Sequence, residues 1–81
     1  MFNKRDIKSI RSEVYQHMGR KVKVKTNLGR NRVGITEGII AETYPSIFLV
    51  QIEADGDIPR RKISYSYNDV ITREIELVVY Q

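Results

Sequence analysis

The sequence predicts a mainly β protein, a small five-stranded barrel of the SH3/Sm-like kind with an N-terminal α-helix in front of it. Three observations indicate this fold: a helical apolar pattern over residues 6–18, five short strand-like segments within residues 20–80, and turn signals between those segments. A short five-stranded sheet either closes on itself or leaves its edges exposed. Closure into a barrel is the expectation here. Because the chain has only 81 residues, we expect residues 1–81 to form a single domain.

The helix prediction depends on one apolar stripe and two end signals. Asp6 stands at the N-cap position, and Gly19 stands where a glycine commonly ends a helix. The stripe would let the helix cover one open end of the barrel. Its residues recur at helical spacing and are Ile7, Ile10, Val14 and Met18.

The strand predictions depend on alternation and on turn residues. Residues 21–25 alternate strictly, which directs the valines to a core and the lysines to solvent. Gly34 and Gly38 indicate bends or a bulge, and Asp55-Gly56 is a hairpin signal. The predicted strands are residues 21–25, 33–43, 47–54, 60–65 and 72–80, with a helical turn at 67–70. The expected core residues are Ile39, Val50, Ile63, Leu77 and Val79.

Length and composition exclude several classes of protein. A chain of 81 residues, 41% of them hydrophobic, can bury one small core but no deep substrate cavity beside it, so we expect no enzyme. The absence of cysteine favours a reducing, cytoplasmic location. Met1–Arg5 is not followed by an apolar run, and no segment approaches the roughly 20 apolar residues of a membrane span. We therefore expect neither a signal peptide nor a membrane partner.

Basic residues are concentrated in the first part of the chain. Residues 1–32 contain ten Lys/Arg and two acidic residues, a net charge of +8, whereas residues 33–81 have a net charge of −4. This asymmetry suggests a polyanionic partner, although basic side chains also keep small domains soluble. The candidate nucleic-acid-binding residues lie on the first strand and the hairpin after it: Arg20, Lys21, Lys23, Lys25, Arg30 and Arg32.

The lysines of the first strand fit two interpretations. A β-strand places Lys21, Lys23 and Lys25 on one face, roughly 6–7 Å apart along the strand. That distance is close to the phosphate spacing of an extended nucleic-acid strand. Alternatively, this is an edge strand, and its lysines prevent aggregation.

Three tyrosines near strand ends are candidate residues for binding a protein partner. If Tyr44, Tyr65 and Tyr67 converge on one rim, they form an aromatic surface that anchors a protein or stacks bases. The alternative is structural, in which each ring covers a barrel end and bonds its hydroxyl to a loop carbonyl.

No group of residues predicts catalysis, and we expect neither a cofactor nor a metal. His17 stands near the helix end, where a positive charge suits the helix dipole, and a metal site needs several ligands at set spacing. Glu74 and Glu76 alternate on a strand, which indicates a solvated strand face rather than an acid/base pair.

Two segments, Ala41–Phe48 and Ser64–Val70, resemble the hallmark stretches of the Veg family. These are short proteins of Gram-positive bacteria, described as stimulators of biofilm formation. The similarity extends over about residues 6–78. It departs from the family pattern at Leu28, where a second glycine is expected before Gly29-Arg30, and after Gln81, where some members carry an acidic or small-residue tail. The resemblance implies a non-enzymatic regulator that acts on the expression of biofilm matrix genes.

Two hypotheses for the function stay open. In the first, the tyrosine rim binds a protein regulator of transcription. In the second, the basic segment 20–32 binds RNA or DNA in the manner of Sm-like proteins, with a strong salt dependence. We also expect a homodimer. The third strand carries apolar residues on both faces, but a barrel has one interior, so the face with Ile47 and Leu49 needs another cover, such as a second subunit.

Overall fold

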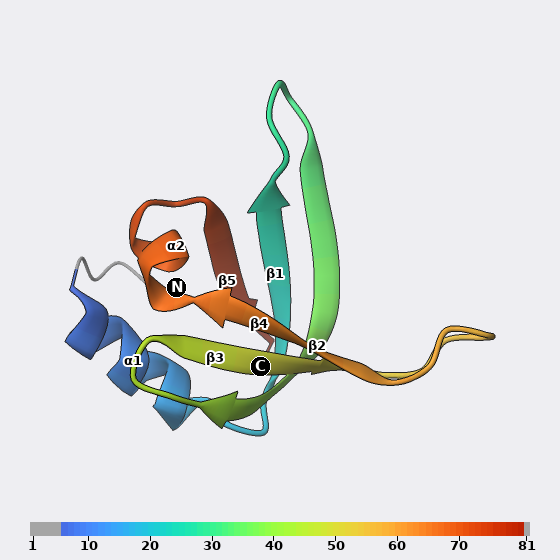
Figure 1. The fold of residues 1–81 in the computed structure, drawn as a ribbon, viewed down its shortest axis with the longest axis horizontal. Helices are drawn as coiled ribbons and strands as arrows, with labels where there is room; N and C mark the ends of the chain where they lie inside the picture. The colour runs from blue at the N-terminus through green and yellow to red at the C-terminus, as the bar shows by residue number, and fades with distance from the viewer. Residues whose placement is uncertain (1–5, 81) are drawn as a thin grey trace.

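The computed structural model describes residues 6–80, which form one strongly curved sheet and two helices (Figure 1). The strand order is β4-β3-β2-β1-β5, and all neighbours are antiparallel. The five predicted strands and the helical turn are confirmed, although the third strand ends at Ile52 instead of residue 54 and the last strand begins at Ile75 instead of residue 72. Lys4 and Arg5, counted in the basic part of the chain, lie outside the described residues. The elements are α1 (Ile7–Gln16), β1 (Lys21–Asn27), β2 (Val33–Thr43), β3 (Ile47–Ile52), β4 (Arg61–Ser66), α2 (Tyr67–Ile71) and β5 (Ile75–Val79).

The predicted closed barrel is wrong, because the sheet stays open between β4 and β5. Within residues 6–80 no strand pairing joins these two edges. The chain between them forms α2, whose Tyr67 and Val70 are buried in the core. Since α2 contacts both β4 and β5, its side chains fill the gap that backbone hydrogen bonds would close in a barrel.

The α1 helix packs on the core through the middle of its predicted stripe. Ile10 and Val14 are fully buried, whereas Ile7 and Met18 are 41% and 39% exposed. Asp6 caps the helix as predicted, and its carboxylate accepts a hydrogen bond from a backbone N–H of the first turn at 2.8 Å. The helix contacts α2 and β2, so it covers one end of the open sheet.

The core lies between one face of the sheet and the two helices. Val50 and Leu77 are buried as predicted, whereas Ile63 and Val79 are half-buried because they lie on the edge strands. Ile39 is half-buried, because the alternation of β2 directs Ile40 into the core instead. The buried residues are Ile10, Val14, Val22, Val24, Ile40, Phe48, Val50, Tyr67, Val70, Ile75 and Leu77.

The β2 strand approaches β3 very closely at Gly38. A Cβ atom on Gly38 would lie 2.4 Å from the backbone oxygen of Gln51 and 2.7 Å from Cγ1 of Val50. Just beyond, the pairing of the two strands shifts between Ile40 and Glu42. Such a bulge increases the local twist, and it confirms the irregularity that the glycines of this strand predicted.

Replacing Gly38 with alanine is expected to destabilise the fold by about 1–3 kcal/mol, as overpacking does, because the backbone of β3 cannot move aside. Thermal unfolding followed by circular dichroism should show a Tm lower by roughly 4–8 °C for each kcal/mol. Gly34→Ala is the matched control, because its Cβ would meet only the end of the Leu28 side chain, at 3.2 Å. Equal losses of Tm in the two variants would contradict the close approach.

Candidate binding surfaces

Lys21, Lys23 and Lys25 lie on the outer face of the sheet, the face turned away from the core. Their alternation with buried valines agrees with the prediction. However, β1 pairs with both β2 and β5, so the interpretation of β1 as an edge strand protected by lysines is wrong. Arg20, just before β1, is exposed. The lysines therefore belong to a central strand, with neighbouring side chains on both sides.

Carboxylates stand opposite two of these lysines. Glu37 of β2 is directly across from Lys23, and Glu76 of β5 is directly across from Lys25. Opposite charges at facing positions of antiparallel strands stabilise the sheet. They also reduce the positive potential that the lysines present to a polyanion.

Tyr80 connects Lys21 to the pair formed by Lys23 and Glu37. Its ring centroid lies 5.4 Å from Nζ of Lys21 and 5.7 Å from Nζ of Lys23, within the range of cation–π attraction. Its hydroxyl donates a hydrogen bond to Glu37. That bond, together with the charges of the two lysines, holds the pKa of Glu37 below its ordinary value. The lysine row is thus engaged with groups of its own sheet.

Arg30 and Arg32 lie in the loop of the β1–β2 hairpin, which projects from the rest of the molecule (Figure 1). Three hydrogen bonds order this loop. The backbone N–H of Leu28 donates to the carbonyl of Arg32 at 3.0 Å, and that of Arg32 donates to the carbonyl of Gly29 at 2.7 Å. The N–H of Gly29 also donates to the Asn27 side chain at 3.0 Å. Both arginines therefore extend from a well-defined turn.

A hollow of about 240 Å³ runs alongside this hairpin, from the end of β1 to the loop residues Gly29 and Asn31, and borders the start of β5. Lys25, Arg32 and Arg73 line it together with Glu74 and Glu76. Arg73 adopts a left-handed backbone conformation, with φ of 65°. Because charges of both signs line the hollow, it favours neither an anion nor a cation.

The three predicted tyrosines do not form one exposed rim. Tyr67 is buried and Tyr65 is half-buried. Their ring centroids lie 5.3 and 5.8 Å from that of Phe48, so both belong to an aromatic cluster on the core side. Burial raises the pKa of Tyr67. Tyr44 is 44% exposed, and it is the member of the set that stands at the surface.

A groove that the sequence analysis missed lies between α1 and the turn that connects β2 to β3. Its volume is about 430 Å³, and none of its lining residues is acidic. Tyr15 is 65% exposed there, opposite Tyr44. Lys8, Arg11 and Tyr15 share one helical face, and this spacing was the available signal. We call the site the tyrosine groove; its residues are Lys8, Arg11, Ser12, Tyr15, Thr43, Tyr44 and Pro45.

Both helices hold the turn that forms one wall of the tyrosine groove. From α1, Nη1 of Arg11 donates a hydrogen bond to the carbonyl of Pro45 at 3.1 Å. From α2, the backbone N–H of Tyr67 donates to the carbonyl of Ser46 at 3.2 Å. Because both helices hold it, the turn keeps a fixed position relative to α1.

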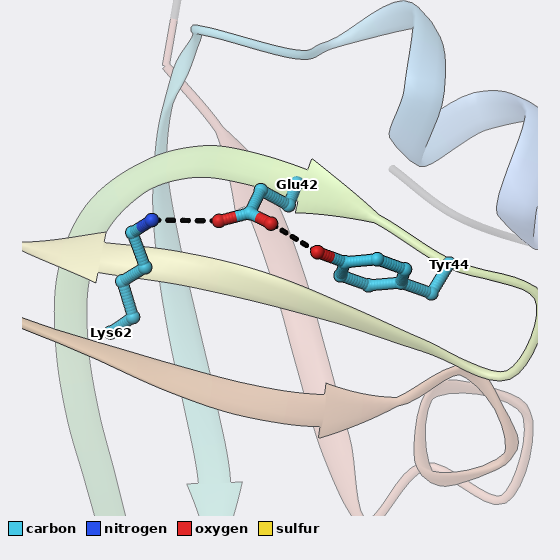
Figure 2. A network of polar contacts seen from close by, with 3 residues as sticks. All are labelled: Glu42, Tyr44 and Lys62. Carbon is cyan, nitrogen blue, oxygen red and sulfur yellow. Dashed lines mark hydrogen bonds and ion pairs between the residues drawn. The ribbon is translucent and has the colours of Figure 1, made fainter.

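Glu42 holds the Tyr44 side chain in place (Figure 2). Its carboxylate accepts hydrogen bonds from the Tyr44 hydroxyl and from Nζ of Lys62, the latter at 2.7 Å. The Lys62 ammonium and the Tyr44 hydroxyl hold the pKa of Glu42 below its ordinary value of 4.5, and the carboxylate in turn raises the pKa of both partners. Charge-assisted bonds of this kind orient an exposed ring well.

These features define a small protein with one antiparallel sheet, two helices and an exposed groove lined by tyrosine and basic side chains. No group of three or more potential metal ligands occurs among residues 6–80. Neither helix in this part of the chain is long and apolar enough to cross a membrane. A family model described as biofilm formation stimulator VEG matches residues 5–78, so the chain belongs to the Veg family. The resemblance drawn from the sequence is confirmed. The search of curated proteins found no match.

The Glu42 network predicts a pKa that responds to its two partners. Measured by NMR titration, the Glu42 pKa should lie below 4.5 in the wild type and rise in both Lys62→Gln and Tyr44→Phe, more in the former because Lys62 has the largest effect. A lowered folded-state pKa stabilises the fold above the unfolded value, and this stabilisation is lost as the pH falls through the folded value. A Glu42 pKa that neither variant changes would contradict the network.

Proposed function

We propose that this member of the Veg family is a non-enzymatic regulatory protein that stimulates biofilm formation by modulating transcription of matrix genes through a macromolecular partner. In this proposal residues 1–81 act as one cytoplasmic domain. The observation that carries the proposal is the tyrosine groove, in which two exposed aromatic rings stand beside two basic side chains. We propose that a protein partner docks there.

The composition of the groove suits a protein contact. Tyrosine and arginine are enriched among the residues that contribute most to binding energy at interfaces. Tyr44 and Arg11 are already held by hydrogen bonds to Glu42 and Pro45, so docking would order few further side chains. With no acidic lining residue, Lys8 and Arg11 favour a partner segment that carries carboxylates.

The double variant Tyr15→Ala/Tyr44→Ala tests this docking site. In a biofilm-forming host without its own Veg-family gene, the wild type should raise the activity of a matrix-gene reporter, and the double variant should lose most of that activity. Tyr80→Ala is the control, because it removes a tyrosine ring outside the groove. Circular dichroism should show that both variants fold. Full reporter activity in the folded double variant would contradict docking in the groove.

A second candidate function is nucleic-acid binding by the basic segment 20–32. Arg30 favours it, because residues 26–36 contain no acidic side chain and Arg30, unlike Arg32, does not line the hollow that also holds Glu74 and Glu76. Affinity purification from cytoplasm, with and without nuclease, separates the two candidates. Partners retained after nuclease treatment support a protein partner, and partners lost on treatment support RNA or DNA.

We also propose self-association through the outer face of β3. Ile47 is 38% exposed and Leu49 half-buried on this face, while the helices pack on the opposite one through Phe48 and Val50. Covering a large aliphatic side chain contributes about 1.5–3 kcal/mol, and two-fold pairing is the commonest arrangement.

Light scattering over a dilution series should therefore show a dimer that dissociates on dilution. Ile47→Lys should shift the equilibrium to the monomer without loss of the fold, because this side chain is exposed. Ile58→Lys, a change of equal chemistry at another exposed isoleucine, is the control. A 9.5 kDa species for the wild type at tens of micromolar would rule the dimer out.

A further inference from the structure

We infer that the tip of the β1–β2 hairpin enters the major groove of duplex DNA, with Arg30 and Arg32 as its contact residues. This inference deepens the second candidate function, on which it rests, and is independent of the tyrosine groove. Four observations carry it: the shape of the hairpin, the order of its loop, its charge and its lack of aromatic residues.

The loop end of the hairpin is free of a third strand, because the pairing of β1 with β5 ends at Thr26 and the last bond between them joins the N–H of Asn27 to the carbonyl of Glu74. It projects beyond the body of the sheet (Figure 1). Paired strands lie about 4.8 Å apart, and the major groove, about 12 Å wide, admits a two-stranded β-ribbon. At Gly34 an added Cβ would lie 3.2 Å from Cδ1 of Leu28. Leu28 therefore packs onto the ribbon where the glycine has no side chain, which keeps the tip thin.

The loop is ordered before any partner arrives. Gly29 and Asn31 adopt positive φ values of 98° and 57° on either side of Arg30, and such values suit glycine and asparagine. The hydrogen bonds between Leu28, Gly29 and Arg32 close the turn. Since the hydrogen bonds already order the loop, binding needs little further ordering of its backbone.

Charge places the contact at the tip rather than along β1. Residues 26–36 contain two arginines and no acidic residue. Glu37 and Glu76, in contrast, face Lys23 and Lys25 across the sheet. Glu74 and Glu76 also line the hollow that Arg32 borders, so Arg30 is the tip arginine that lies outside it. A phosphate backbone following the lysine row would meet these carboxylates, whereas a duplex that takes the tip into its major groove would meet Arg30.

The side chains of the hairpin favour duplex DNA over the other nucleic acids. Proteins that hold single strands stack the bases on aromatic rings, and residues 25–36 contain no aromatic residue. The major groove of duplex RNA is too deep and narrow for side chains to read. Arginine pairs well with guanine edges, and apolar side chains contact thymine methyl groups. Leu28 and Val33, 56% and 60% exposed, supply such apolar contacts.

Fluorescence anisotropy with a labelled 20-base-pair DNA duplex of mixed sequence tests the inference. The full chain should bind with a salt slope, and Arg30→Gln/Arg32→Gln should reduce that slope by up to about two phosphate contacts and weaken binding roughly tenfold or more at 0.1 M salt. The matched control is Arg60→Gln/Arg61→Gln, which removes the same charge at the start of β4 and should change binding little. Protection of guanine N7 from dimethyl sulfate should mark major-groove entry.

Several results would overturn the inference. Equal weakening by the two double variants would show that overall charge, not the hairpin, drives binding, and an unprotected guanine N7 would exclude the major groove. Tighter binding to a 20-nucleotide single strand than to the duplex would overturn the duplex contact while supporting the second candidate function. Absence of binding to either probe at 50 mM salt would overturn both.

Discussion

The burial of α2 between the two edges of the sheet is the constraint on which the rest of the structure depends. Tyr67 and Val70 enter the core at the place where β4 and β5 would otherwise meet. From this position α2 contacts α1 and, through the N–H of Tyr67, holds the β2–β3 turn at Ser46. The short helix therefore determines both the open form of the sheet and the position of one wall of the tyrosine groove.

Cross-strand neighbours decide where positive charge remains available on this protein. The lysines of β1 lie among Glu37, Glu76 and Tyr80 on the outer face, so a row that looks basic in sequence is largely compensated in the sheet. Lys8 and Arg11 of the tyrosine groove, in contrast, line a surface without acidic residues, and Arg30 of the hairpin tip lies outside the hollow that holds Glu74 and Glu76. Pairing across strands thus moves the candidate contacts away from the middle of β1, to the hairpin loop and to the tyrosine groove.

The sequence predicted the structural features that depend on residues close together in the chain. Alternation in β1, the Asp6 cap and the helical turn after Ser66 are local patterns, and all are found in the structure. Closure of the barrel depends on whether two edges distant in sequence pair, and no local pattern encodes that. The prediction that Ile39 lies in the core was wrong, because the alternation of β2 directs Gly38 and Ile40 inward and leaves Ile39 on the other face.

The candidate site was predicted only in part, because surfaces are made by elements from different parts of the chain. Tyr44 was selected from its position near a strand end, but its neighbours in the groove come from α1. Tyr65 and Tyr67 were selected for the same reason, yet they pack against Phe48 on the core side of the sheet. The helical spacing of Lys8, Arg11 and Tyr15 was visible in the sequence. The sequence did not show that the β2–β3 turn lies opposite this helical face and forms the other wall of the groove.

The order of the strands also has a consequence for assembly of the chain. β1 to β4 pair in succession as neighbours, whereas β5 returns from the other end of the chain to pair with β1. A ladder between distant segments forms against a larger loop-closure entropy than a hairpin does. In any state with β5 detached, β1 has an open side, and its lysines then stand where lysines discourage association between chains. A strand that is central in the finished sheet is in this way guarded while the sheet is incomplete.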